Sequence, residues 1–158
     1  MPDPPKVSTC LWFDGDAEEA AAFYTSLLPD SQITSVVRRA ANAPALLVEF
    51  TLGGAPFQAL NGGPQYTFSE AASISVMTED QEETDRLWAA LIANGGRESQ
   101  CAWLKDRFGM SWQIVPRALP RLLGSTDHAA AERAMQAMMG MRKIDIAALE
   151  AAYRGAQR

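Results

Sequence analysis

The fold is decided by a stretch near the start of the chain, VSTCLWFDGDAEEAAAFYTSL, at residues 7–27. Its first seven residues are mostly apolar or β-branched, which predicts a strand over 7–13. Apolar residues then recur at helical spacing, and this predicts a helix with Asp16 as N-cap and Glu19 as its capping-box partner. Three more strands are expected, at 33–38, 45–52 and 56–61, with a hairpin turn at Gly53-Gly54. The stretch therefore opens a βαβββ module.

The same order of elements recurs from residue 73 onward. Residues 73–93 read SISVMTEDQEETDRLWAALIA and predict a strand followed by a helix that begins near Asp80. A shift of 64 positions carries Thr9 onto Ser73 and Asp16 onto Asp80. Three strands are expected after this helix, at about 97–98, 101–106 and 110–115. The chain therefore contains two tandem copies of one module.

The character of the sequence changes after Pro116, where Ala and Met recur at helical spacing. Helices are predicted near 118–123, 127–139 and 145–153. The expected fold class is α+β: two βαβββ modules that form a curved mixed sheet, with a C-terminal helical extension. The modules span about 7–63 and 73–116, the domain that contains them spans 1–116, and the extension spans 117–158.

Composition restricts the partners. Among 158 residues, 14 Lys and Arg against 19 Asp and Glu give a net charge of −5 without a basic cluster, which argues against nucleic acid. No continuous apolar stretch of about 20 residues is present, so we expect no membrane span. The opening MPDPPK shows no secretory signal, and Cys10 and Cys101 are expected to be reduced thiols, so we expect a cytoplasmic protein.

Several short motifs carry a family resemblance. They are Leu11-Trp12-Phe13-Asp14-Gly15, Asn61-Gly62-Gly63-Pro64, Trp103, Asp106-Arg107-Phe108-Gly109 and Trp112-Gln113-Ile114-Val115-Pro116. With the two modules, they resemble the PhnB-like branch of the glyoxalase or vicinal oxygen chelate (VOC) superfamily. Members of this branch are often labelled 3-demethylubiquinone-9 3-methyltransferase.

The resemblance implies a location for the ligand site. Metal-using members of the superfamily take four His or Glu ligands from the two modules, and the corresponding positions here are Thr9, Gln58, Ser73 and Gln113. Hydroxyls and neutral amides are poor ligands for a divalent metal, so we expect no metal and no other cofactor. His128, the sole histidine, lies in the helical extension and is expected to be a surface residue, so no catalytic residue is assigned.

The preferred hypothesis is a protein without metal that binds an unidentified small organic ligand. We expect Thr9, Gln58, Ser73 and Gln113 to line its cavity, together with Trp103 as the aromatic wall. One alternative is an enzyme, either the methyltransferase of the family label or a VOC-type lyase or dioxygenase. Another is a structural module whose cavity is filled by side chains. A homodimer is expected, and pairing of the modules within one chain or between two stays open.

Overall fold

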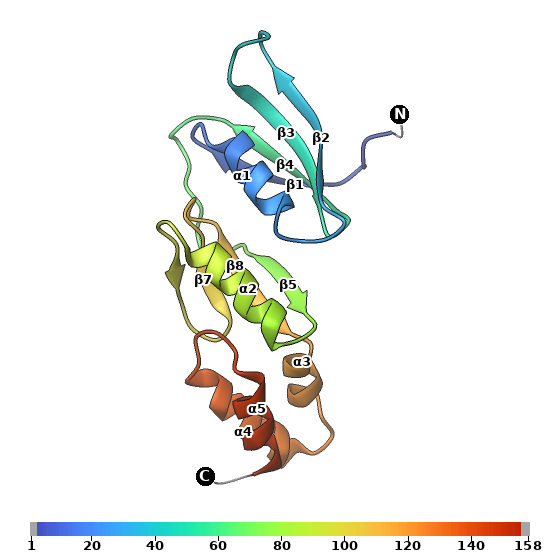
Figure 1. The fold of residues 1–158 in the computed structure, drawn as a ribbon, viewed down its shortest axis with the longest axis vertical. Helices are drawn as coiled ribbons and strands as arrows, with labels where there is room; N and C mark the ends of the chain where they lie inside the picture. The colour runs from blue at the N-terminus through green and yellow to red at the C-terminus, as the bar shows by residue number, and fades with distance from the viewer. Residues whose placement is uncertain (1–2, 156–158) are drawn as a thin grey trace. The chain divides into compact units, whose positions relative to one another are not determined.

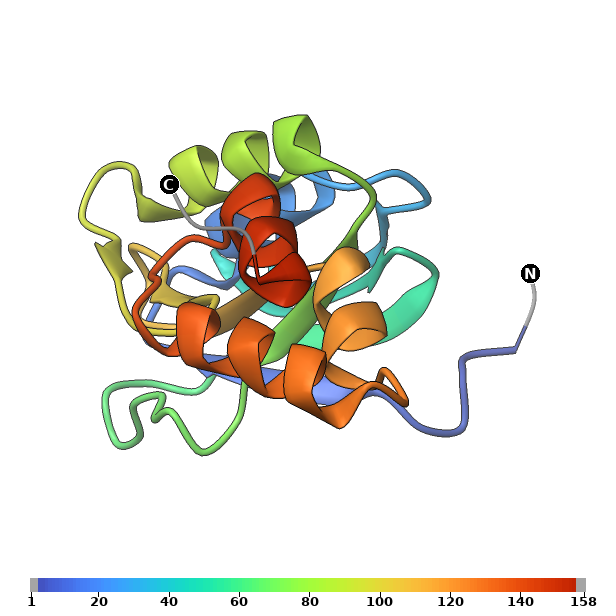
Figure 2. The same ribbon diagram turned by 90° about the horizontal axis from the view of Figure 1, so that it is seen from below.

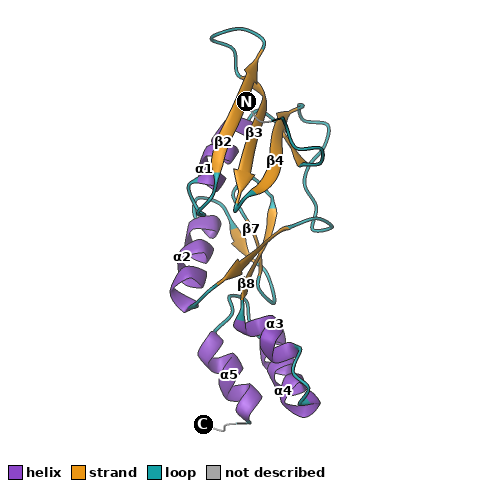
Figure 3. Ribbon diagram, turned by 90° about the vertical axis from the view of Figure 1, so that its right-hand side faces the viewer, coloured by secondary structure: helices purple, strands orange, loops and turns teal. Residues whose placement is uncertain are grey.

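The structure is a computed structural model that describes residues 3–155 and divides into two compact units, 3–68 and 69–155 (Figure 1). Each unit contains one four-stranded mixed sheet, and helices follow the second sheet (Figure 3). The predicted α+β fold with two βαβββ modules is thus confirmed. Within the described residues, none of the helices combines the length and apolar character that a membrane crossing requires.

The first unit is a sheet with one helix on it. Its strand order is β1-β4-β3-β2, with β1 parallel to β4 and the other pairs antiparallel. The elements are β1 (Thr9–Phe13), α1 (Ala17–Thr25), β2 (Gln32–Arg38), β3 (Ala45–Leu52) and β4 (Ala55–Asn61). Helix α1 contacts β3 and β4, and its Tyr24 packs against Phe50 with ring centroids 6.5 Å apart. Both side chains are fully buried, so they form the centre of this core.

The start of α1 differs from the prediction. Asp16 is the N-cap, but its side chain makes no capping hydrogen bond. The backbone amide of Ala17 instead donates to the side-chain Oδ1 of Asn61 at 2.9 Å. The side-chain Nδ2 of Asn61 donates in turn to the Ala45 carbonyl. A residue from β4 thus satisfies the first free amide of the helix, which local sequence could not reveal.

The second unit repeats this plan. Its strand order is β5-β8-β7-β6, again with one parallel pair, β5 with β8. The elements are β5 (Ile74–Thr78), α2 (Gln81–Ile92), β6 (Arg97–Glu98), β7 (Trp103–Lys105) and β8 (Ser111–Pro116). Helix α2 has the cap that α1 lacks, since the Asp80 side chain accepts from the Glu83 amide at 2.9 Å. Trp88 and Trp112 are buried in the core of this unit.

Strand β7 is shorter than the predicted 101–106. Cys101 and Ala102 both have left-handed backbones, with φ of 56° and 79°, so they cannot continue an extended strand. Their amides donate to the carbonyls of Met141 and Arg142 at 2.8 and 2.9 Å. The C-terminal segment therefore holds this bend in place.

Three helices complete the second unit, α3 (Ala118–Leu123), α4 (His128–Met139) and α5 (Ile146–Arg154) (Figure 2). They enclose a core of buried side chains that includes one residue of the preceding module, Ala102. Its other members are Leu119, Leu122, Ala134, Ile144 and Leu149. The extension is thus packed with the second module in one unit, and the division of the chain at residue 116 stays a prediction.

Candidate functional site

The predicted site residues of the first unit lie on different faces of its sheet. Strand pairing places Thr9 beside Phe57 and places Gln58 beside Cys10. Paired residues on neighbouring strands present their side chains to the same face, and successive residues alternate. Thr9 therefore shares the helix-covered face with Leu11, whereas Gln58 lies on the opposite face.

The face that carries Gln58 also carries Cys10 and Glu49. Both are register partners of Gln58, and the Gln58 amide nitrogen lies 3.5 Å from Oε1 of Glu49. Cys10 is exposed, but partial desolvation raises the pKa of its thiol, so this thiol stays protonated at neutral pH and is a weak nucleophile. The group offers one amide, one carboxylate and one neutral thiol.

The second unit brings three predicted site residues together. Gln113 in β8 pairs with Trp103 in β7 and with Ser75 in β5. Its side-chain nitrogen donates to Oγ of Ser73 at 2.9 Å. Ser73, Trp103 and Gln113 therefore lie on one face, the one opposite the buried Trp112.

The sequence shift that relates the two modules differs between their first strands and their helices. Helices α1 and α2 begin 64 residues apart, as predicted, but Cys10 with Gln58 in one sheet corresponds to Ser75 with Gln113 in the other. The first strands of the two modules are therefore 65 residues apart, one more than the two helices. Three residues connect β1 to α1 and only two connect β5 to α2, so the first strand is displaced by one position. A displacement of one residue moves a side chain to the other face, which is why Thr9 and Ser73 are not equivalent.

A cavity of about 230 Å³ lies beside Trp103 in the second unit. Its lining includes Trp103, Lys105 and Ser111 on the face that carries Gln113, and Lys105 is the register partner of Ser111. Glu70, from the segment before β5, forms an ion pair with Lys105 across this opening. That ion pair and its hydrogen bond lower the pKa of the Glu70 carboxyl, so it is ionised at neutral pH.

Ser111 is unusual among the cavity residues. Its side chain is 1% exposed, and among residues 3–155 its Oγ is the one buried side-chain oxygen or nitrogen without a hydrogen-bond partner. A buried hydroxyl without a partner costs about 1–3 kcal/mol. The site therefore contains an unsatisfied donor.

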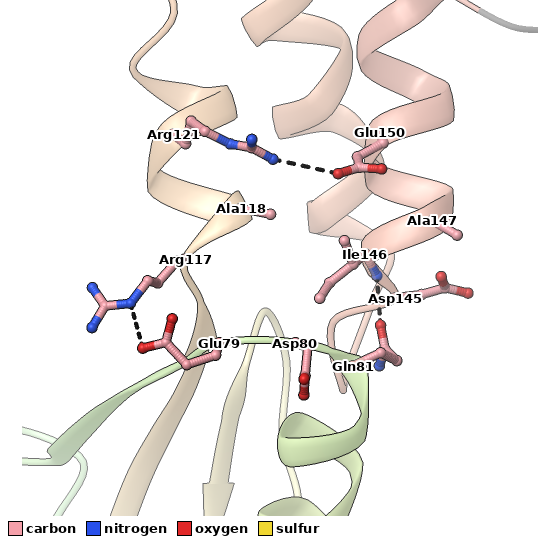
Figure 4. A pocket seen from close by; sticks show the side chains of 10 residues that line it. All are labelled: Glu79, Asp80, Gln81, Arg117, Ala118, Arg121, Asp145, Ile146, Ala147 and Glu150. Atoms are coloured by element: carbon pink, nitrogen blue, oxygen red, sulfur yellow. Dashed lines mark hydrogen bonds and ion pairs between the residues drawn. The ribbon is translucent and has the colours of Figure 1, made fainter.

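A larger cavity, about 550 Å³, lies between α3, α5 and the start of α2 (Figure 4). Arg117 pairs with Glu79 at 2.7 Å, and Arg121 reaches Glu150 at 3.4 Å. Both arginines are thus neutralised by carboxylates of this chain. Gln81 lies at the base of this cavity, and its Oε1 accepts from the Ile146 amide at 2.8 Å.

The residues at the ligand positions do not fit a divalent metal. The predicted set of Thr9, Gln58, Ser73 and Gln113 supplies neutral oxygens alone. Strand pairing adds the Cys10 thiol and the Ser75 hydroxyl, and Glu49 is a carboxylate beside Gln58. Across residues 3–155 no group of three or more His, Cys, Asp or Glu side chains is placed to hold a metal ion. We therefore derive no chemistry through a metal.

The motif Asn61-Gly62-Gly63-Pro64 has a structural explanation. A Cβ on Gly62 would lie 2.3 Å from the ring of Trp12, so only glycine allows this approach. The Trp12 indole donates to the Gly63 carbonyl at 2.9 Å, and Tyr66 packs edge-on against its ring at 4.9 Å. Trp12 is thus partly buried, unlike Trp88 and Trp112.

With this geometry described, comparison with known proteins identifies the family. The model of the 3-demethylubiquinone-9 3-methyltransferase family matches residues 5–115. The chain belongs to this family. No match is found among curated proteins. Helices α3 to α5 lie beyond the matched residues.

One solved structure agrees with the family, and more distant ones share the fold. A PhnB protein from Bacillus cereus is 33% identical, with a TM-score of 0.64 over 71% of this chain and 99% of that one. The protein PA1353 from Pseudomonas aeruginosa is 20% identical, with a TM-score of 0.58 over 72% of this chain and 98% of that one. The fosfomycin resistance protein FosX from Listeria monocytogenes shares the fold at 12% identity, with a TM-score of 0.51 over 73% of this chain and 94% of that one. The predicted PhnB-like resemblance is confirmed.

Sequence reasoning missed several residues of these sites. Lys105 and Ser111 lie in predicted strands. A two-residue alternation counted from Trp103 would have placed Lys105 on the same face as Trp103, and one counted from Gln113 would have done so for Ser111. The pairing of Glu70 with Lys105 had no sequence signal, since Glu70 lies outside any predicted element. Nor did composition predict the cavity between α3 and α5.

Proposed function

We propose that this protein binds a small organic ligand, without a divalent metal, on the sheet face of the second unit that carries Trp103 and Gln113. The observation that carries the proposal is the group formed by Ser73, Trp103 and Gln113, of which Trp103 also lines the 230 Å³ cavity. An aromatic wall with a few positioned polar groups is the usual construction of a small-molecule site. In the first unit we propose Gln58 with Cys10, rather than Thr9, as the corresponding group, because these two share a face.

The test is a mass-spectrometric survey of molecules that the purified protein releases on denaturation. Wild type is compared with Trp103→Ala and Gln113→Leu, and with Gln136→Leu on the exposed surface of α4 as the matched control. We expect at least one molecule to be retained by wild type and by the control and to be depleted in both site variants. The same set of molecules from all four proteins would contradict the proposal.

An enzymatic function is the second candidate. The observation in its favour is the description of the family, which names a methyltransferase acting on 3-demethylubiquinone-9. The lyase or dioxygenase alternative would need metal ligands, and the groups around Gln58 and Gln113 supply few. We therefore propose ligand binding first, and the S-adenosylmethionine experiment in the Discussion separates the two candidates.

We further propose a homodimer located in the cytoplasm. Strand β2 forms the outer edge of the first unit's sheet, and Ile33, Val36 and Val37 on it are exposed. An exposed apolar edge strand is a surface on which a second chain can pair. Light scattering at micromolar concentration should report a dimer, and Val37→Lys should shift it to monomer. Both cysteines are unpaired, which is the usual state in a reducing compartment.

A further inference from the structure

The inference starts from the unsatisfied hydroxyl of Ser111. Native proteins pair nearly all of their buried polar atoms, so a buried oxygen without a partner calls for an explanation. Ser111 lies against a cavity and not in a sealed core. A bound molecule could supply the missing hydrogen-bond partner of this hydroxyl. If residue 111 served only to pack the core, an alanine would do so without a buried, unpaired hydroxyl.

Cationic side chains lie in the same row of the sheet as Ser111. Strand pairing places Arg97 of β6 beside Lys105 of β7, and Lys105 beside Ser111 of β8. All three side chains therefore point to one face, and all three line the cavity. The adjacent row contains Trp103 and Gln113. Two cations and a hydroxyl donor form the charged end of a site whose wall is aromatic.

Glu70 occupies the place that an acidic ligand would take. Its carboxylate pairs with Lys105, although Glu70 itself lies outside the sheet and its side chain is 66% exposed. Exposed ion pairs contribute little stability, and such a side chain exchanges readily with solvent. A competing oxyanion could therefore displace Glu70 from Lys105 without disturbing the strands.

We propose that this cavity binds the oxyanion group of an organic molecule, with Lys105 and Arg97 as charge partners and the Ser111 hydroxyl as hydrogen-bond donor, and that Glu70 competes for the same place. The inference rests on the proposed function and adds the chemical class of the ligand. A carboxylate or a phosphoryl group would make the same contacts. At about 30 Å³ per water-sized atom, the cavity has room for roughly eight non-hydrogen atoms.

The test uses benzoate and its neutral analogue benzamide as probes, with methylphosphonate as a second anion. Binding is measured by ligand-detected NMR titration of the full chain. The variants are Lys105→Met, Ser111→Ala and Glu70→Gln, and Lys143→Met is the control because Lys143 pairs with Asp85 on α2 instead. Tighter binding of methylphosphonate than of benzoate would indicate that the site prefers a phosphoryl group. Tighter binding of benzoate would indicate that it prefers a carboxylate.

We expect at least one anion to bind wild type with a Kd of about 1 mM and benzamide to bind roughly tenfold more weakly. Lys105→Met should weaken anion binding about tenfold, and Ser111→Ala roughly fivefold. Glu70→Gln should strengthen it about threefold, because the competing carboxylate is gone. Ser111→Ala should also raise the Tm of the free protein by roughly 2–4 °C, an effect that a hydroxyl with a structural partner would not produce.

Other outcomes overturn the inference. If benzamide binds as tightly as benzoate and Lys105→Met changes nothing, the site takes neutral molecules, so the oxyanion proposal fails while ligand binding stands. If neither anion binds any variant, the oxyanion proposal also fails, and the survey of retained molecules decides the proposed function independently. An unchanged anion affinity in Glu70→Gln would contradict the proposed competition between Glu70 and the ligand.

Discussion

The indole Nε1 of Trp112 donates a 2.8 Å hydrogen bond to Oδ2 of Asp106, and both side chains are buried. The other oxygen of Asp106 accepts from the amides of Phe108 and Met110. One carboxylate thus closes the turn between β7 and β8 and anchors the core beneath it. Lys105 and Ser111 flank this turn. The same interaction therefore holds in place the side chains that we propose contact the ligand.

Asp106→Ala should lower the free energy of unfolding by about 3 kcal/mol, since three donors, two of them buried, lose their acceptor. Trp112→Phe should cost about 2 kcal/mol, the value for a hydrogen bond to a charged group. Trp103→Phe is the control and should change stability by less than about 1 kcal/mol, because that side chain is only partly buried. Urea unfolding measures all three, and equal losses for the two tryptophans would contradict the assignment.

Gln81→Ala should loosen α5. The Gln81 side chain donates to the Ile144 carbonyl and accepts from the Ile146 amide, so one residue of α2 holds the start of that helix. We expect a loss of about 1–2 kcal/mol and faster hydrogen exchange at the Ile146 amide. Gln136→Ala, which removes only a bond to Glu132 on the same helix, should leave that amide unchanged.

The correct predictions and the failures have separate physical causes. Apolar periodicity placed both modules and all three C-terminal helices, because burial of one face decides where an element forms. The side on which Thr9 lies depends on one additional connecting residue before α1, and composition does not report such a displacement. The bend at Cys101 depends on carbonyls 40 residues further along the chain, so local pattern predicted a longer strand.

Acid should weaken the contact between α2 and the loop before α5. Hydrogen bonds from Gln81 and then Lys143 lower the pKa of Asp85 below its ordinary value of 3.8. A lowered pKa contributes stability above the ordinary value, and that contribution is lost as pH falls through the folded-state pKa. Since the pair is about half exposed, Asp85→Asn should cost at most about 0.5 kcal/mol at pH 7, and this cost should shrink as pH falls below 3.8. A difference that persists in acid would contradict the electrostatic origin.

Metal should be present in less than stoichiometric amount. Gln58, Ser75 and Gln113 provide no imidazole or carboxylate. Beside them lie one carboxylate, Glu49, and one protonated thiol, Cys10, and the described residues place no group of three or more such ligands, so Zn, Ni, Mn and Fe have no strong ligand set. Elemental analysis of the purified protein checks the content, and Tm with and without chelator checks the fold. One tightly held metal per chain, or a Tm that falls with chelator, would show that the prediction is wrong.

S-adenosylmethionine should not bind at concentrations up to about 1 mM. Enzymes that bind this donor in a parallel sheet use a glycine-rich first turn, whereas the connections at 14–16 and 79–80 contain one glycine and several acidic residues. Calorimetry measures the binding directly. Saturable micromolar binding that Gln113→Leu abolishes would restore the methyltransferase candidate.

The left-handed pair at Cys101 and Ala102 also has a consequence for sequence evolution. Its amides are satisfied by Met141 and Arg142, and the Ala102 methyl is part of the helical core. The bend therefore depends on the extension. In a relative without these helices, glycine at the two positions, or an uninterrupted strand, would be more stable than the left-handed Cys-Ala pair. Positions 101 and 102 should therefore hold glycine or strand-forming residues more often in relatives without the three helices than in relatives that have them.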